Sequence, residues 1–157
     1  MNSTDNANHP AGLFSPPTWD AMPDLGLYMD QVITYLDQKC RPLYPDTASF
    51  ITPAMVNNYV KSGVIDRPSG KKYNRDLLAQ LIMLCTLKPA ISLDDLKRLL
   101  KPADGQTMAE LYQDFCQSQT KVFAEVIERQ PQATALELAL EAAICSILSE
   151  QFLKITE

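Results

Sequence analysis

The sequence has very few of the side chains on which catalysis usually depends. Among its 157 residues there is a single histidine, His9, in an N-terminal stretch rich in Pro, Asn, Ser and Thr. It contains no nucleophile elbow, no glycine-rich phosphate loop and no paired-carboxylate motif. We therefore expect no catalytic site and no cofactor, and we predict that the protein is not an enzyme.

Cysteine is scarce and widely spaced. The four cysteines stand at positions 40, 85, 116 and 145, with no CxxC pair, so their spacing predicts neither a metal site nor a disulfide framework. The N-terminal residues lack the basic and apolar regions of a signal peptide. No apolar run reaches the roughly 20 residues that a membrane-spanning helix needs. We expect a reduced, cytoplasmic protein with no membrane contact.

Positive charge is short in the whole chain but concentrated in its centre. The net charge is -5. Between Pro53 and Lys101, however, nine basic and four acidic residues give +5, whereas residues 1–52 carry −4 and residues 102–157 carry −6. A basic centre between acidic flanks indicates a local surface for a polyanionic partner.

The apolar residues, 46% of the total, recur at helical spacing and predict an all-α protein. Residues that favour helix starts and ends mark the boundaries: Thr52, Asn74 and Ser92 as N-caps, and Gly63 as the residue past a helix end. The pairs Thr107/Glu110 and Thr134/Glu137 have capping-box spacing. Six helices are predicted, over about 25–40, 53–62, 75–87, 92–100, 108–129 and 135–155.

Between the second and third predicted helices lies "VIDRPSGKKY". Two short extended pieces around Pro68-Ser69-Gly70 predict a small β-hairpin. We divide the chain into a flexible leader (1–23), a winged helix-turn-helix domain (24–103) and a C-terminal antiparallel helical hairpin (104–157). That hairpin would pack on the domain or on a second copy of the chain.

A winged helix-turn-helix consists of a short capped helix, a basic hairpin and two further helices, and this chain is predicted to have all of these elements in that order. Base edges are read by short polar side chains on a helix in the major groove, and Asn57 and Asn58 suit adenine. Phosphates need cations, which Lys61 supplies one turn further on and Lys71 and Lys72 supply at the hairpin.

These residues resemble the DNA-binding region of MerR-type regulators. In that family a recognition helix ends in R-Y-Y-x-x-x-G-L-[IL], where this chain has "NNYVKSGVI", with Tyr59 and Gly63 at the matching positions. Lys71-Lys72-Tyr73 matches the basic pair and Tyr that close the wing, and "ISLDDL" matches the family's "fSLxEI". About 50 residues are covered, and the whole chain is also similar to a bacterial family of MerR-like proteins without an established function.

The chain departs from the MerR pattern at three places. Asn57 and Asn58 stand where the family has Arg and its first Tyr. The short leading helix is missing or replaced by residues 25–40, and two helices over 108–155 replace the long dimerisation helix. The resemblance therefore implies the fold and DNA binding, but not the signal to which the protein responds.

From the residues and the resemblance together, we predict a sequence-specific transcriptional regulator that binds double-stranded DNA. A single recognition helix reads only a few base pairs, so we expect a homodimer formed through the C-terminal helices. Tyr59 is explained better by packing than by contact, although its hydroxyl could still reach a phosphate. The predicted DNA-binding residues are Asn57, Asn58, Tyr59, Lys61, Arg67, Lys71, Lys72, Tyr73 and Arg75.

Two alternatives stay open. In the first, the winged-helix scaffold is a protein-interaction module whose last two helices bind a partner. In the second, the chain is a sensor for a small-molecule effector, with a pocket between those helices. A continuous basic face made by Lys61, Lys71, Lys72 and Arg75 would favour DNA, whereas an exposed apolar groove would favour a partner or ligand.

Overall fold

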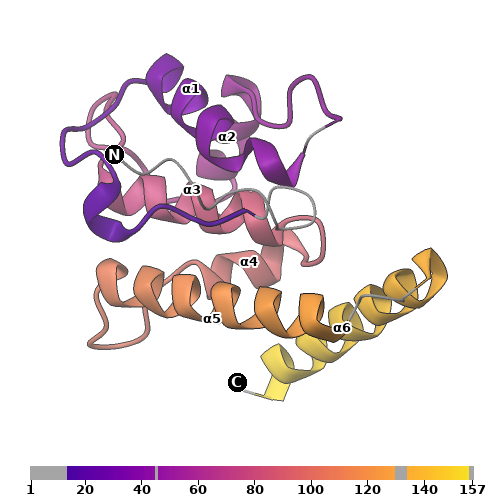
Figure 1. Cartoon of the computed structure of the whole chain (residues 1–157). Helices are drawn as coiled ribbons and strands as arrows, with labels where there is room; N and C mark the ends of the chain where they lie inside the picture. Colours follow the sequence, from indigo (N-terminus) through magenta and orange to yellow (C-terminus); the bar gives the residue numbers. More distant parts are fainter. Residues whose placement is uncertain (1–13, 45, 130–133, 156–157) are drawn as a thin grey trace, which may run out of the picture.

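The computed structural model describes residues 14–44, 46–129 and 134–155. Within them the fold contains six α-helices, two short 3-10 helices and no β-strand, which confirms the predicted all-α class (Figure 1). None of the helices in these ranges combines the length and apolarity needed to cross a membrane. The helices are α1 (Met29–Cys40), α2 (Pro53–Lys61), α3 (Arg75–Leu87), α4 (Leu93–Leu99), α5 (Met108–Arg129) and α6 (Ala135–Ile155), with 3-10 turns at Trp19–Ala21 and Arg41–Leu43.

The predicted helix caps are confirmed, whereas the first helix begins at Met29 and not at about residue 25. Thr52, Asn74 and Ser92 each accept the backbone N–H of the residue three positions on, at 3.1–3.2 Å. Gly63 follows α2 with a φ of +76°, a conformation that costs other residues energy. Both predicted capping boxes also form, before α5 and before α6.

Helix α3 is the centre of the domain. Its nine consecutive residues Leu77–Cys85 are all buried, as its nearly continuous apolar sequence predicts. Figure 1 shows α3 between α1 and α2 on one side and α4 and α5 on the other, and its largest contacts are with α5 and α1. The sides of α3 are therefore covered by elements from both halves of the chain.

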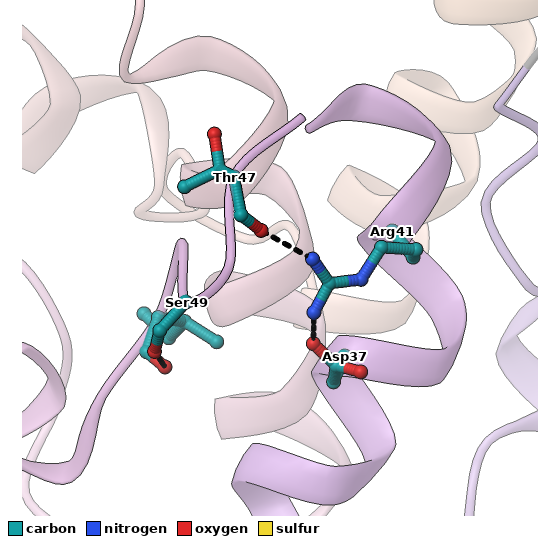
Figure 2. Close-up of polar contacts among 5 residues, drawn as sticks. Asp37, Arg41, Thr47 and Ser49 are labelled. Carbon is teal, nitrogen blue, oxygen red and sulfur yellow. Dashed lines mark hydrogen bonds and ion pairs between the residues drawn. The ribbon is translucent and has the colours of Figure 1, made fainter. Parts of the chain in front are cut away.

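Arg41 helps to fix the connection from α1 to α2. Arg41, just after α1, binds the Asp37 carboxylate and donates to the Thr47 carbonyl (Figure 2). Its guanidinium also lies 5.4 Å from the centre of the Phe50 ring. These contacts hold residues 46–50 against the end of α1 and so set the position at which α2 begins.

The N-terminal segment (residues 14–23) is not the flexible leader that its composition predicts. Phe14 and Met22 are buried in the core. The Gln119 amide donates to the Phe14 carbonyl and the Tyr112 hydroxyl to the Pro17 carbonyl, each at 2.7 Å. The segment therefore packs along α5, and only residues 1–13 of the expected leader lie outside the described residues.

The domain boundary expected at residue 103 also differs from the structure. Met108 and Tyr112 are buried in the same core as α3, so the first half of α5 belongs to the folded domain. Helix α6 has no buried residue; Ser146 donates to the Ala90 carbonyl at 2.7 Å, and Arg98 to the Leu153 carbonyl at 3.4 Å. The large apolar side chains of this helix, which the prediction packs on the domain or on a second copy of the chain, are largely exposed in the single chain.

The predicted β-hairpin is reduced to a basic turn (residues 66–73). Ser69 and Lys72 form an isolated bridge, and Tyr73 pairs with Leu27 through backbone bonds of 2.8 and 2.9 Å. Pro68 has no N–H to donate to a ladder. Because Asn74 already caps α3, too few residues remain for a return strand, and the last of them bonds outside the turn.

Candidate nucleic-acid interface

Helix α2 separates an inner apolar face from an outer polar one. Val56 is fully buried, and Tyr59 and Val60 pack partly against the core. Asn57, Asn58 and Lys61 are exposed. The helix thus presents the predicted base-reading and phosphate-binding side chains to solvent, as a recognition helix must.

The basic turn is held next to α2 by a buried glutamine. Gln80 on α3 is fully buried. Its oxygen accepts the Asp66 N–H at 3.0 Å, and its Nε2 donates to the Asp66 carboxylate at 2.8 Å and to the Leu100 carbonyl at 3.3 Å. These bonds fix the start of the turn relative to α3 and the end of α4. Sequence reasoning missed Gln80, although a lone amide in "LLAQLIMLC" was a visible signal.

The far end of the turn packs on the residues before α1. A Cβ at Gly26 would lie only 2.9 Å from the Lys72 Cβ, so the close approach requires glycine. The Lys72 ammonium then lies 5.3 Å from the centre of the Tyr28 ring. Lys72 is exposed, but Gly26 positions the start of its side chain and the Tyr28 ring positions its ammonium group.

Helix α2 and the basic turn meet α1 at a surface hollow of about 440 Å³. Asn57 contributes from α2, Gly70 and Lys71 from the turn, and Tyr28 and Asp30 from the start of α1. An amide, a lysine and an aromatic ring thus surround one concave surface. Asp30 is the acidic group there, and it would disfavour a phosphate directly above it.

The structure does not place every predicted site residue on this surface. Asn57, Asn58, Lys61, Arg67, Lys71 and Lys72 are exposed on α2 and the basic turn. Tyr59 is half-buried; burial raises the pKa of its hydroxyl, and proximity to Cys85 adds to the rise, so its ring faces the core. We assign Tyr59 to packing.

Tyr73 and Arg75 differ from the expectation. Tyr73 is only 4% exposed, because its ring packs in the core while its backbone pairs with Leu27. The Arg75 guanidinium lies 5.7 Å from the Trp19 ring centre and 4.0 Å from the Asp20 carboxylate. Its buried Nε has no hydrogen-bond partner. Both residues hold distant segments in place rather than extending the basic face.

The basic residues between Pro53 and Lys101 fall into two groups, those that contact other parts of the fold and those that are exposed to solvent. Lys88 donates to the Phe50 carbonyl at 2.9 Å and covers the Tyr44 and Phe50 rings. Lys97 lies 3.8 Å from Asp94. Lys88 thus stabilises the fold and Lys97 forms a surface pair within α4. The exposed cations of α2 and the basic turn are available to a partner. In the described part of the chain, no three His, Cys, Asp or Glu side chains come together to hold a metal ion.

The comparisons with known proteins give one match. A protein-family model described as a domain of unknown function (DUF1836) matches residues 17–117, which is more than half of the chain. The match begins in the N-terminal segment and ends within α5, so it covers the elements that build the core. No curated protein and no solved structure matches the chain significantly.

Proposed function

The chain belongs to the DUF1836 family of domains, and we propose that it is a sequence-specific, DNA-binding transcriptional regulator of the MerR-like type. The observation that carries the proposal is the hollow at which Asn57 of α2 meets Lys71 of the basic turn. A groove-reading amide beside a phosphate-binding lysine is the minimal chemistry of duplex recognition.

In this proposal, α2 enters the major groove with Asn57 and Asn58 facing base edges. A neutral amide can donate to and accept from adenine, where the MerR pattern places arginine instead. Lys61 at the end of α2 would bind a phosphate on one side of the groove. Lys71 and Lys72 would bind the backbone on the other side, where a winged helix has its wing.

The basic turn would act as a shortened wing. It has the position of a wing, after the recognition helix and before α3, but not its paired strands. Rigidity comes from the Gln80 bonds at one end and the Leu27–Tyr73 pair at the other. A turn anchored at both ends can present lysines without a β-ladder.

We further propose a homodimer formed through α6. Large apolar side chains on this helix are between 42% and 77% exposed, and a helix that is apolar on most sides is normally buried. A two-fold pair would place two α2 helices on the half-sites of a palindrome. The apolar residues concerned are Leu136, Leu138, Leu140, Ile144, Ile147, Leu148, Phe152 and Ile155.

The same exposed helix is what favours the alternative function, a protein-interaction module. In that case α6 would bind a different protein, and the hollow between α2 and the basic turn would bind no nucleic acid. The two functions differ in their response to duplex DNA.

The test is selection from a random double-stranded DNA library at about 100 mM salt, followed by sequencing. The regulator predicts enrichment of one motif, arranged as an inverted repeat. Absence of enrichment, together with absence of salt-sensitive binding to bulk DNA, would contradict the regulator and favour the protein-interaction module.

A further inference from the structure

A second cavity, of about 410 Å³, lies between the N-terminal segment and α5. Trp19 and Tyr112 form an aromatic corner, with ring centres 6.1 Å apart and planes inclined at 55°; the Trp19 ring is partly exposed and the Tyr112 ring is buried behind it. The volume falls in the range of small-molecule sites, which is roughly 300–1,000 Å³. The cavity is separate from the hollow at α2 and shares no lining residue with it.

The lining indicates the class of ligand. Gln113 and Gln117 are exposed on α5 and offer amide donors and acceptors beside the aromatic corner. The charged side chain at the cavity is Asp20, whose carboxylate is 97% exposed. The exposed part of the Trp19 ring and the Asp20 carboxylate favour a planar organic cation over an anion. We propose that this cavity binds a small planar aromatic molecule that carries an amidine or amine group.

The position of the cavity suggests what binding would change. Arg75 contacts both Trp19 and Asp20, and it is the first residue of α3, two positions after the last residue of the basic turn. A cation at Asp20 would compete with Arg75 for the carboxylate. Occupancy would therefore displace the Arg75 guanidinium, a cation three residues beyond Lys72. This consequence, unlike binding itself, rests on the proposed DNA function.

Binding can be measured without DNA, because Trp19 is the only tryptophan and gives a single indole N–H resonance. We would titrate the full chain with benzamidine, benzamide and benzoate, which share a shape and differ in charge. The expected result is a saturable shift of the indole resonance with benzamidine, at a Kd of about 1 mM, as suits so few atoms. Benzamide should bind more weakly and benzoate weakest.

A cavity-filling variant provides the control. Ala109→Leu places a larger side chain in the cavity and should weaken benzamidine at least about tenfold. Ala124→Leu makes the same change at an exposed position further along α5 and should leave binding unchanged. Gln113→Phe, which places a larger side chain at the same cavity, serves as the blocking variant if Ala109→Leu does not fold. An unsaturable shift, tighter binding of benzoate, or equal binding to the blocked variant would overturn the site.

The coupling is tested separately, by DNA affinity with and without 10 mM benzamidine, a concentration of about ten times the expected Kd. We expect a change of about fivefold in the Kd for DNA, which is the weak end of typical allosteric effects. The Ala109→Leu variant should show no change. Saturable binding with unchanged DNA affinity would overturn the coupling. A chain that binds benzamidine but no DNA at all would overturn the proposed regulator and leave the cavity assigned.

Discussion

At the scale of single residues, Asn57 and Lys71 lie at one hollow but have different expected roles. Asn57→Ala should cost about 1–3 kcal/mol on a selected DNA site, because an amide that reads a base edge is lost. The same change should leave the affinity for random duplex unaltered. Fluorescence anisotropy with the two duplexes measures both values. Equal losses on both would show that Asn57 does not read sequence.

Lys71→Ala is the natural contrast to Asn57→Ala, because it should weaken binding to both duplexes alike. Both side chains are exposed, so neither change is expected to alter stability by more than about 0.5 kcal/mol. A difference between the two variants can therefore be attributed to DNA contact rather than to folding.

Single residues also show how far sequence reasoning reaches. Thr52 and Gly63 were predictable because caps and left-handed glycines act within one helical turn. The resemblance to a MerR wing predicts that Tyr73 contacts DNA, and the cluster of basic residues beside Gly70 predicts the same for Arg75. Their actual positions depend on Leu27 and Trp19, which are more than 40 residues away in sequence. No local pattern carries that information.

At the scale of elements, Gln80 joins the basic turn to α3 and α4. Gln80→Leu would keep the volume but leave the Asp66 N–H and the Leu100 carbonyl without partners in a buried site. We expect a loss of about 2 kcal/mol or more in the free energy of unfolding. Urea denaturation measures it.

The matched control is Gln38→Leu, the same change at an exposed position on α1. It should cost within about 0.5 kcal/mol. If the two variants were equally stable, the bonds of Gln80 would not hold the turn in place.

The helices were more predictable than the connections between them. Periodicity and caps gave α5 and α6 their bounds, since both signals are local. The hairpin prediction was wrong because turn residues such as Pro68 and Gly70 indicate a reversal of the chain but not the partner of each strand. Here the partner of Tyr73 is Leu27, before α1. The exposure of α6 could likewise not be predicted from its sequence, because its apolar composition is typical of a buried helix.

At the scale of the whole molecule, tyrosine burial predicts loss of stability at high pH. Burial raises the pKa of Tyr44 to about 12, and burial also raises the pKa of Tyr59, Tyr73 and Tyr112. The folded chain then keeps protons that the unfolded chain, with tyrosine pKa values near 10, releases. The contribution of these tyrosines to the free energy of unfolding should be constant below pH 10 and should fall as the pH rises from 10 to 12.

Urea midpoints between pH 9 and 12 measure this dependence, with tyrosinate absorbance as an independent readout. Tyr112→Phe should flatten the slope, because one retained proton is removed. Its lost bond to the Pro17 carbonyl should lower stability at every pH. A midpoint that does not change above pH 10 would mean that these hydroxyls titrate as freely in the folded chain as in the unfolded one.

Self-association is the second property of the whole molecule. If α6 pairs with a second copy, light scattering should give twice the chain mass of 17.5 kDa. Ile144→Glu puts a charge on a 56% exposed position of that helix and should shift the protein toward monomer.

Ala103→Glu adds the same charge on an exposed loop before α5 and should leave the dimer intact. A monomeric wild-type chain at high concentration would contradict the homodimer. It would leave the exposed face of α6 for a different protein.

The central claim, that α2 and the basic turn form a DNA-binding face, is tested most directly by the salt dependence of binding to a random duplex. Each phosphate contact contributes about 0.9 to the slope of log affinity against log salt. Lys71→Ala with Lys72→Ala should therefore lower the slope by about 1.8. Lys121→Ala with Lys154→Ala, which removes two charges from α5 and α6, should leave it unchanged. Equal slopes for the two double variants, or no salt-sensitive binding by the wild-type chain, would contradict the DNA-binding face.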